Sequence, residues 1–191
     1  MRVVIEPHNP IWITRFNEVK NSLAAILEGV PIIGIEHVGS TSVPDLPAKP
    51  VLDIDIVIDA ENIAAARKVL VSRGYTDLGE VGIADRYAFR QPGFKHGDGS
   101  NGTALANGIM RMNTYVVLEG SLALRNHRDL KRVLLEDAGL RKEYGDVKLA
   151  LAKTEFSNVD EYCDAKDEII LKILRRASWS EKDLGELKEK S

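Results

Sequence analysis

Residues 35–59, IEHVGSTSVPDLPAKPVLDIDIVID, decide the fold of this 191-residue chain. Apart from Asp53 and Asp55, residues 51–58 are all β-branched or apolar, which predicts a buried strand. Because side chains alternate along a strand, both aspartates fall on one face. Two carboxylates in an apolar strand repel each other and are costly to bury unpaired. We therefore expect a cation between them, and Mg²⁺ is the natural candidate because it binds carboxylate and phosphate oxygens together.

A phosphate-binding turn is expected just before this strand. Residues 31–38 read as a first strand, and Gly39 then allows a sharp turn with positive φ. The following residues offer hydroxyl and backbone N–H groups: Ser40, Thr41 and Ser42. The same Gly-Ser-Thr-Ser sequence is equally typical of an ordinary turn or helix N-cap. Three prolines within residues 44–50 exclude a long helix between the strands. The turn and the aspartates are therefore expected to converge at one end of a sheet.

These residues together resemble a known family. Gly39-Ser40, a spacer and Asp53-Ile54-Asp55 look like the signature of the nucleotidyltransferase-fold superfamily. More narrowly, residues 37–44, HVGSTSVP, with the following Ala48-Lys49-Pro50, resemble the GrpB family. Further matches are Pro7, Pro10, Trp12, Phe16, Glu143, Tyr144, Lys148, Tyr162, Lys166 and Ile170. The similarity predicts a single domain over residues 1–178, followed by a charged tail over residues 179–191.

The resemblance implies an α/β fold with a nucleotidyltransferase-like mixed β-sheet, flanked by helices and followed by C-terminal helices. It also implies transfer of a nucleoside monophosphate from a nucleoside triphosphate to an acceptor, which we expect to be a small molecule. One or two Mg²⁺ ions would be held by Asp53 and Asp55. Gly39, Ser40, Thr41 and Ser42 would hold the triphosphate. Glu119, which ends an apolar strand, is the first candidate for a third, catalytic carboxylate and Asp85 the second, although either is also typical of a surface residue.

Basic residues in three parts of the chain are candidates for neutralising phosphate charge. Lys49 lies in the loop that joins the turn to the aspartates, where a solvated lysine is also common. Arg86 and Arg90 alternate with Tyr87 and Phe89, so both guanidinium groups face either a phosphate or solvent. On the C-terminal helices, Lys148, Lys153 and Lys166 are expected to supply at least one point charge to a triphosphate, with Lys166 as the main candidate.

The chain departs from the family pattern in two places, and this leaves other functions open. Where many members show His-x-His, the chain reads Asn113-Thr114-Tyr115. Leu130-Lys131-Arg132 stands in place of a Phe-Arg-Asp helix pattern, although Arg128-Asp129 lies two residues earlier. One alternative is a noncatalytic or regulatory nucleotide-binding module. Another is a partner-binding protein that uses the charged tail as its contact.

Composition limits the remaining possibilities. A chain of 191 residues with 44% hydrophobic content can bury one good core. The net charge of −3 argues against general nucleic-acid binding, which usually needs a basic footprint. The single cysteine, Cys163, excludes an intrachain disulfide. No segment approaches the ~18 consecutive apolar residues of a membrane span, so we expect no membrane insertion and a cytoplasmic location.

Periodicity predicts the remaining elements. Helices are expected over residues 10–27, 61–74, 122–135, 140–153 and 160–177. Two further strands are expected over residues 86–91 and 110–118, joined by a glycine-rich loop.

Overall fold

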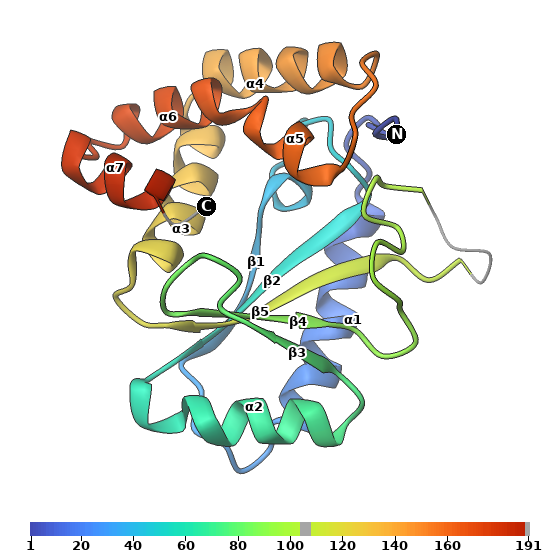
Figure 1. Ribbon diagram of the computed structural model, residues 1–191, viewed down its shortest axis with the longest axis vertical. Helices are drawn as coiled ribbons and strands as arrows, with labels where there is room; N and C mark the ends of the chain where they lie inside the picture. Colours follow the sequence, from blue (N-terminus) through green and yellow to red (C-terminus); the bar gives the residue numbers. More distant parts are fainter. Residues whose placement is uncertain (104–107, 190–191) are drawn as a thin grey trace.

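A mixed five-stranded sheet forms the centre of the molecule (Figure 1). The computed structural model describes residues 1–103 and 108–189. The strands are β1 (Gly34–Val38), β2 (Val51–Ile58), β3 (Thr76–Gly79), β4 (Arg86–Arg90) and β5 (Arg111–Leu118). Their order in the sheet is β1-β2-β5-β4-β3, and all neighbours are antiparallel except β2 and β5, which are parallel. The predicted α/β class with a mixed sheet is therefore confirmed.

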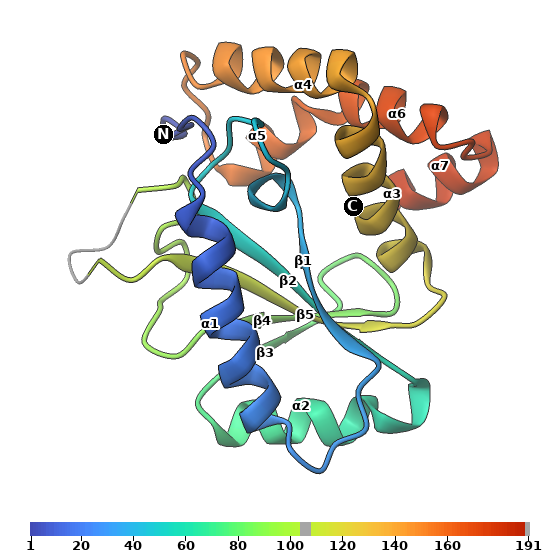
Figure 2. The ribbon, with the colours of Figure 1, turned by 180° about the vertical axis from the view of Figure 1, so that it is seen from behind.

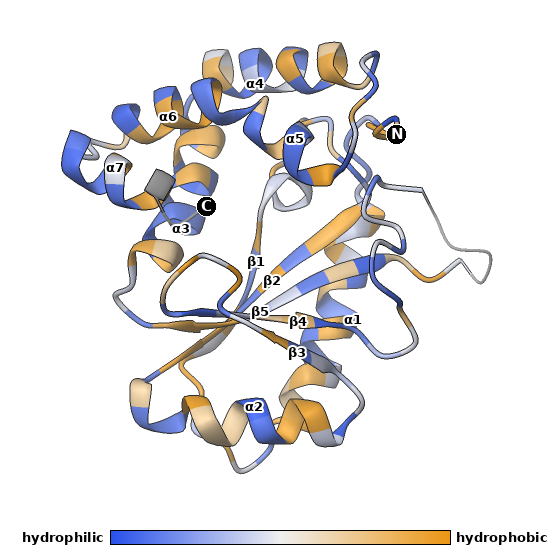
Figure 3. Ribbon diagram, in the orientation of Figure 1, coloured by the Kyte–Doolittle hydropathy of each residue, from blue (hydrophilic) through white to orange (hydrophobic). Residues whose placement is uncertain are grey.

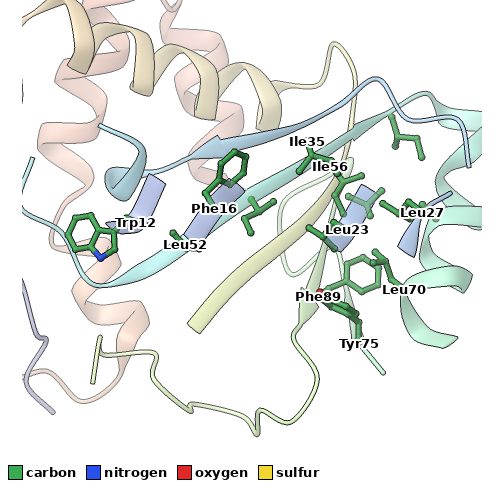
Figure 4. Packing of buried hydrophobic residues seen from close by; sticks show 14 of the residues in the cluster. Trp12, Phe16, Leu23, Leu27, Ile35, Leu52, Ile56, Leu70, Tyr75 and Phe89 are labelled. Atoms are coloured by element: carbon green, nitrogen blue, oxygen red, sulfur yellow. The ribbon is translucent and has the colours of Figure 1, made fainter. Parts of the chain in front are cut away.

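One face of the sheet is dedicated to the main hydrophobic core. Helix α1 (Ile11–Ile26) lies across this face, as Figure 2 shows from behind, and α2 (Ile63–Ser72) packs at one end of the same layer. A short 3-10 turn, η2 (Ala60–Asn62), leads into α2. Figure 4 shows the α1 residues packed against side chains from the strands and α2. The β2 residues in this core are Leu52, Ile54, Ile56 and Ile58, each at most 1% exposed. Burying one such side chain contributes about 1.5–3 kcal/mol, so this layer carries much of the stability.

The C-terminal helices form a second layer on the other side. They are α3 (Leu122–Glu136), α4 (Ala138–Leu151), α5 (Val159–Asp164), α6 (Asp167–Arg176) and α7 (Glu181–Glu189). Figure 1 shows α4, α5 and α6 gathered beyond the end of the sheet where β1 ends and β2 begins. In Figure 3, α4 and α6 carry bands of hydrophobic and hydrophilic residues, as expected for helices with one buried face. Val43 and Leu46 join Ile169 and Ile173 in a second core, which fixes the loop before β2 to these helices.

The sequence predictions hold for most elements and miss three features. Strand β3, TDLG, has no fully buried residue and therefore gives almost no apolar signal. The helix expected over residues 160–177 is divided into α5 and α6. The charged tail predicted over residues 179–191 forms α7 and buries Trp179 and Leu184 against neighbouring helices. Residues 190 and 191 of that tail lie outside the described part of the chain.

The helices of the described ranges include none that is both long and apolar enough to cross a membrane.

Candidate functional site

Gly39 forms the turn that follows β1 and lies directly against Asp53. Its φ of 67° and ψ of −174° fall in a region that is essentially restricted to glycine. A Cβ built on Gly39 would lie 2.3 Å from Asp53 Oδ2, closer than any real contact. Val38, the last residue of β1, pairs with Asp53 in the antiparallel ladder. The structure thus brings the glycine turn and the first aspartate together, as the sequence predicts.

The turn continues as a short 3-10 helix, η1 (Ser40–Ser42), whose hydroxyls hold its shape. Ser42 Oγ donates to the Gly39 carbonyl at 2.7 Å, and Thr41 Oγ1 donates to the Val51 carbonyl at 3.2 Å. Thr41 therefore ties the turn to the start of β2. Within the described residues, the Ser40 side chain makes no hydrogen bond, so its hydroxyl is the one available to a ligand.

His37 supports this turn from the opposite face of the sheet. Its ring stacks on Phe16 of α1 at 4.6 Å between centroids, and its Nε2 lies 3.0 Å from Thr41 Oγ1. Burial, helped by the charges of Lys131 and His8, lowers the pKa of His37 to about 4. A neutral, stacked imidazole on the core side is a structural support and does not face the aspartates.

Asp53 and Asp55 lie side by side on the polar face of β2. Asp55 is fully buried, and its Oδ1 has no hydrogen-bond partner in the described structure. Burial raises the pKa of Asp53, with a further rise from Asp55, while Asn113, His127 and Lys49 act in the opposite direction. Asp55 is thus buried and Asp53 half-buried, and a cation bound between them would stabilise their ionised forms.

Two donors from other elements hold one oxygen of each aspartate. Asn113 of β5 pairs with Asp53 in the parallel ladder, and its Nδ2 donates to Asp53 Oδ1 at 2.8 Å. His127 of α3 places Nδ1 2.8 Å from Asp55 Oδ2. Burial alone would lower the pKa of His127, but the charge and hydrogen bond of Asp55 raise it above its ordinary value. Tyr115, the β5 partner of Asp55, lies beside His127 with 5.8 Å between ring centroids.

The structure places both candidate third carboxylates away from this centre. Glu119 lies four residues beyond Tyr115, about 13 Å along the chain at ~3.3 Å per residue. There it forms an ion pair with Arg128 at 3.0 Å, and Arg128 also contacts Glu36 at 2.6 Å. Asp85 precedes Arg86, which pairs with Val117, so it lies toward the same distant end of the sheet.

Three lysines that interact electrostatically with Asp53 lie over the rings of two tyrosines. We call Lys49, Lys148 and Lys166 the lysine cluster. Lys49 and Lys166 lie over the Tyr162 ring at 5.2 and 4.3 Å from its centroid. Lys148 lies over Tyr144 at 4.4 Å. Together with Tyr162 of α5, the lysine cluster joins the loop before β2 with α4 and with the residue that precedes α6.

Lys148 is the most unusual member of the lysine cluster. It is 2% exposed, and its Nζ has no hydrogen-bond partner in the described part of the chain. Burial and the charge of Lys166 lower the pKa of Lys148 well below its ordinary value, although Asp53 acts to raise it. Burial and Lys166 also lower the pKa of Lys49, whose Nζ donates to the Ser100 carbonyl at 3.0 Å. By contrast, Lys153 is exposed.

Two arginines of β4 lie on the same face of the sheet as the aspartates, on the opposite side of β5 from β2. Register places Arg86 and Arg90 on the face of Asp53, while Tyr87 and Phe89 face the core, as the alternation predicts. The Arg86 guanidinium lies 4.5 Å from the centroid of the Tyr115 ring, and its buried Nε has no hydrogen-bond partner in the described structure.

Two residues that support the site, His127 and Arg111, were not predicted from the sequence. Arg111 donates to the Asp98 carbonyl at 2.5 Å and to Asn113 Oδ1 at 3.3 Å, and so supports the residue that holds Asp53. His127 directly precedes Arg128-Asp129 in the sequence. It contacts Asp55 only because of the position of α3 in the folded structure. No local signal reveals that contact.

Comparison with known proteins gives the family of the chain. The family model described as GrpB protein matches residues 2–176. The UPF0157 protein YqkA of Bacillus subtilis is 31% identical over 172 residues; the match covers 88% of this chain but only 45% of that protein. A UPF0157 protein of Pseudomonas aeruginosa is 31% identical over 182 residues, covering 92% of this chain and 68% of the relative.

A solved structure of a GrpB protein shares the fold. The crystal structure of the conserved protein GrpB from Enterococcus faecalis matches with a TM-score of 0.74 and 26% identity, over 91% of this chain and 96% of that one. A structure of Cid1 with the UTP analog UMPNPP matches with a TM-score of 0.43 and 11% identity, over 75% of this chain and 43% of that one. A likeness as distant as the latter assigns no substrate.

Proposed function

The chain belongs to the GrpB protein family, and we propose that it binds a nucleoside triphosphate with Mg²⁺ and transfers the nucleoside monophosphate to a small-molecule acceptor. The observation that best supports this proposal is a pair of buried ionisable groups near Asp53, one carboxyl and one amine, each with an atom that lacks a partner. Asp55 Oδ1 and Lys148 Nζ both lack a hydrogen-bond partner within the described residues. Buried unpaired charges cost stability. A bound metal and a bound phosphate would give each of them a partner.

Asp53 and Asp55 are the residues that would hold Mg²⁺, as one or two ions. In the described ranges, no group of three or more His, Cys, Asp or Glu side chains is placed to hold a metal. Magnesium suits such a site because it commonly takes one or two carboxylates and completes its shell with water and phosphate oxygens. When bound, it would neutralise phosphate charge and orient the α-phosphate for in-line attack.

The triphosphate would lie between the Gly39 turn and the lysine cluster. Gly39 allows the backbone of η1 to approach closely, and the Ser40 hydroxyl is available to an oxygen of the β- or γ-phosphate. The lysine cluster supplies three amino groups, and none of them forms an ion pair with a carboxylate within the described residues. Arg86 would contribute a guanidinium from the β4 side.

These residues suit displacement at the α-phosphorus. The acceptor atom forms a bond to phosphorus while the bond to the β-phosphate oxygen breaks, and pyrophosphate leaves. Negative charge grows on the leaving pyrophosphate, where the lysine cluster would stabilise it more in the transition state than in the bound substrate.

A nucleotide-binding module without transfer is the second candidate. The observation that favours it is the absence of a carboxylate from the β5 positions opposite the aspartates, which hold Asn113 and Tyr115. Transfer would then lack a third carboxylate to act as metal ligand or general base.

Pyrophosphate release separates the two candidates. The protein is incubated with Mg²⁺, each of the four common nucleoside triphosphates, and pools of small metabolites. Release that is lost in Asp53→Asn but kept in Lys153→Met, an exposed control, supports transfer. Binding of a triphosphate without release supports the module. A protein that binds no nucleotide contradicts both.

A further inference from the structure

His127 is the only side chain of α3 that hydrogen-bonds a β2 aspartate among the described residues. We propose that His127 is a positioning residue for the metal site: its Nδ1 donates to Asp55 Oδ2 and fixes the carboxylate with Oδ1 directed to the cation. This inference rests on the proposed function, because it requires a metal at Asp53 and Asp55.

The two aspartates are held in a matching way. Asn113 occupies Asp53 Oδ1, and His127 occupies Asp55 Oδ2. This leaves Asp53 Oδ2, which faces Gly39, and the unpartnered Asp55 Oδ1. A hydrogen bond to one oxygen of a carboxylate restricts rotation of the carboxylate about its terminal side-chain bond. The other oxygen is then already positioned for a ligand. A carboxylate without such support would lose entropy when it binds the ion.

The element that carries His127 is itself fixed to the sheet. Lys131, one turn later on α3, donates from Nζ to the His37 carbonyl of β1 at 2.7 Å. Arg128, which directly follows His127, bridges Glu36 of β1 and Glu119, the residue after β5. With α3 tied to the sheet at these points, the imidazole is a preorganised donor.

The donor role does not depend on the charge of the ring. An ionised carboxylate only accepts hydrogen bonds, so Nδ1 must carry the proton in the contact with Asp55. A shorter amide donor at the same position can therefore replace it, whereas an aromatic ring without nitrogen cannot. His127→Asn and His127→Phe provide this pair of variants.

The test is Mn²⁺ binding followed by electron paramagnetic resonance, with the metal alone and with a non-hydrolysable ATP analogue. Loss of a supporting hydrogen bond around a metal ligand typically weakens affinity by about 10–100-fold. We expect a loss of this size in His127→Phe, and an affinity close to that of the natural chain in His127→Asn. His96→Phe, in an exposed loop, is the control and should bind as the natural chain does.

Each outcome decides a separate point. If Asp53→Asn abolishes Mn²⁺ binding but His127→Phe leaves it unchanged or tighter, the metal site stands and the positioning role is wrong. A lower melting temperature in His127→Phe without weaker binding has the same meaning, since it shows support of the fold alone. Equal losses in His127→Phe and His127→Asn also contradict the donor role. If the natural chain binds no Mn²⁺ under either condition, the metal site and the inference fail together.

Discussion

Replacing Lys148 by methionine should stabilise the unliganded protein and abolish triphosphate binding. Methionine keeps most of the length of the unbranched lysine side chain, with a thioether sulfur in place of one methylene, and removes the ammonium group. In the structure that group is buried without a hydrogen-bond partner among the described residues, and its main contact is the Tyr144 ring at 4.4 Å. A residue kept for stability would show the opposite response.

The size of the effect follows from two opposing contributions. An unsatisfied buried donor costs roughly 1–3 kcal/mol, and more when it is charged. The cation–π contact with Tyr144 returns about 2 kcal/mol when desolvated. Because a charged donor lies at the upper end of that cost, we expect a net gain of about 1 kcal/mol in the free energy of unfolding, which corresponds to a rise in Tm of about 2–4 °C for a chain of this size.

The pH dependence gives a further check on the cause. Because the pKa of Lys148 is lowered in the folded state, the folded protein binds fewer protons than the unfolded chain between that lowered pKa and 10.5. The natural chain therefore gains stability as pH rises through this window. The advantage of Lys148→Met should shrink as pH approaches 10.5, while Lys153→Met should show no advantage at any pH.

Thermal unfolding followed by circular dichroism, with and without Mg²⁺ and a triphosphate, measures both effects. A ligand should raise the Tm of the natural chain and leave that of Lys148→Met unchanged. A Lys148→Met protein that is less stable than the natural chain and still binds the triphosphate would refute the reasoning.

Three further predictions concern other parts of the structure. Gly39→Ala should cost about 1–3 kcal/mol in urea unfolding because its backbone region is restricted to glycine, whereas Gly34→Ala, which meets no atom within 4 Å, should cost far less; equal costs would contradict the close contact with Asp53. The natural chain should lose stability as pH falls from 6.5 toward 4, by about 2 kcal/mol at pH 5, because the pKa of His37 is lowered in the folded state. His37→Gln should remove this loss, and His96→Gln should leave it intact. An unchanged pH profile in His37→Gln would show that the imidazole is not buried neutral. Leu184→Ala should destabilise the protein by about 2 kcal/mol because Leu184 is 3% exposed, whereas the exposed Lys182→Ala should have little effect; no difference between them would mean that α7 frays.

The strands could be predicted from sequence where alternation and glycine leave few choices. Residues 51–58 specify their own buried strand, and the short proline-broken connection can only return beside β1. The contact of Gly39 with Asp53 follows from that topology. Strand β3 gives no comparable signal, because it lies at the sheet edge with a polar sequence.

The supporting residues of the site could not be predicted in the same way. His127 and Lys148 reach the aspartates from helices more than 70 residues away in the chain. Their placement depends on the second hydrophobic core, in which Leu46 packs with Ile173. Glu119 was predicted as a site residue because it ends an apolar strand. However, β5 runs parallel to β2 and ends beyond the aspartates, so Glu119 lies away from them.

The most direct measurement of the central claim is calorimetric titration of a non-hydrolysable nucleoside triphosphate into the natural chain, with and without Mg²⁺, and into Asp53→Asn and Lys148→Met. If Asp53, Asp55 and the lysine cluster form one site, binding will require Mg²⁺ and both side chains, and each variant will weaken it at least about tenfold, or 1.4 kcal/mol. Binding that is independent of Mg²⁺ and unchanged in both variants would contradict the account.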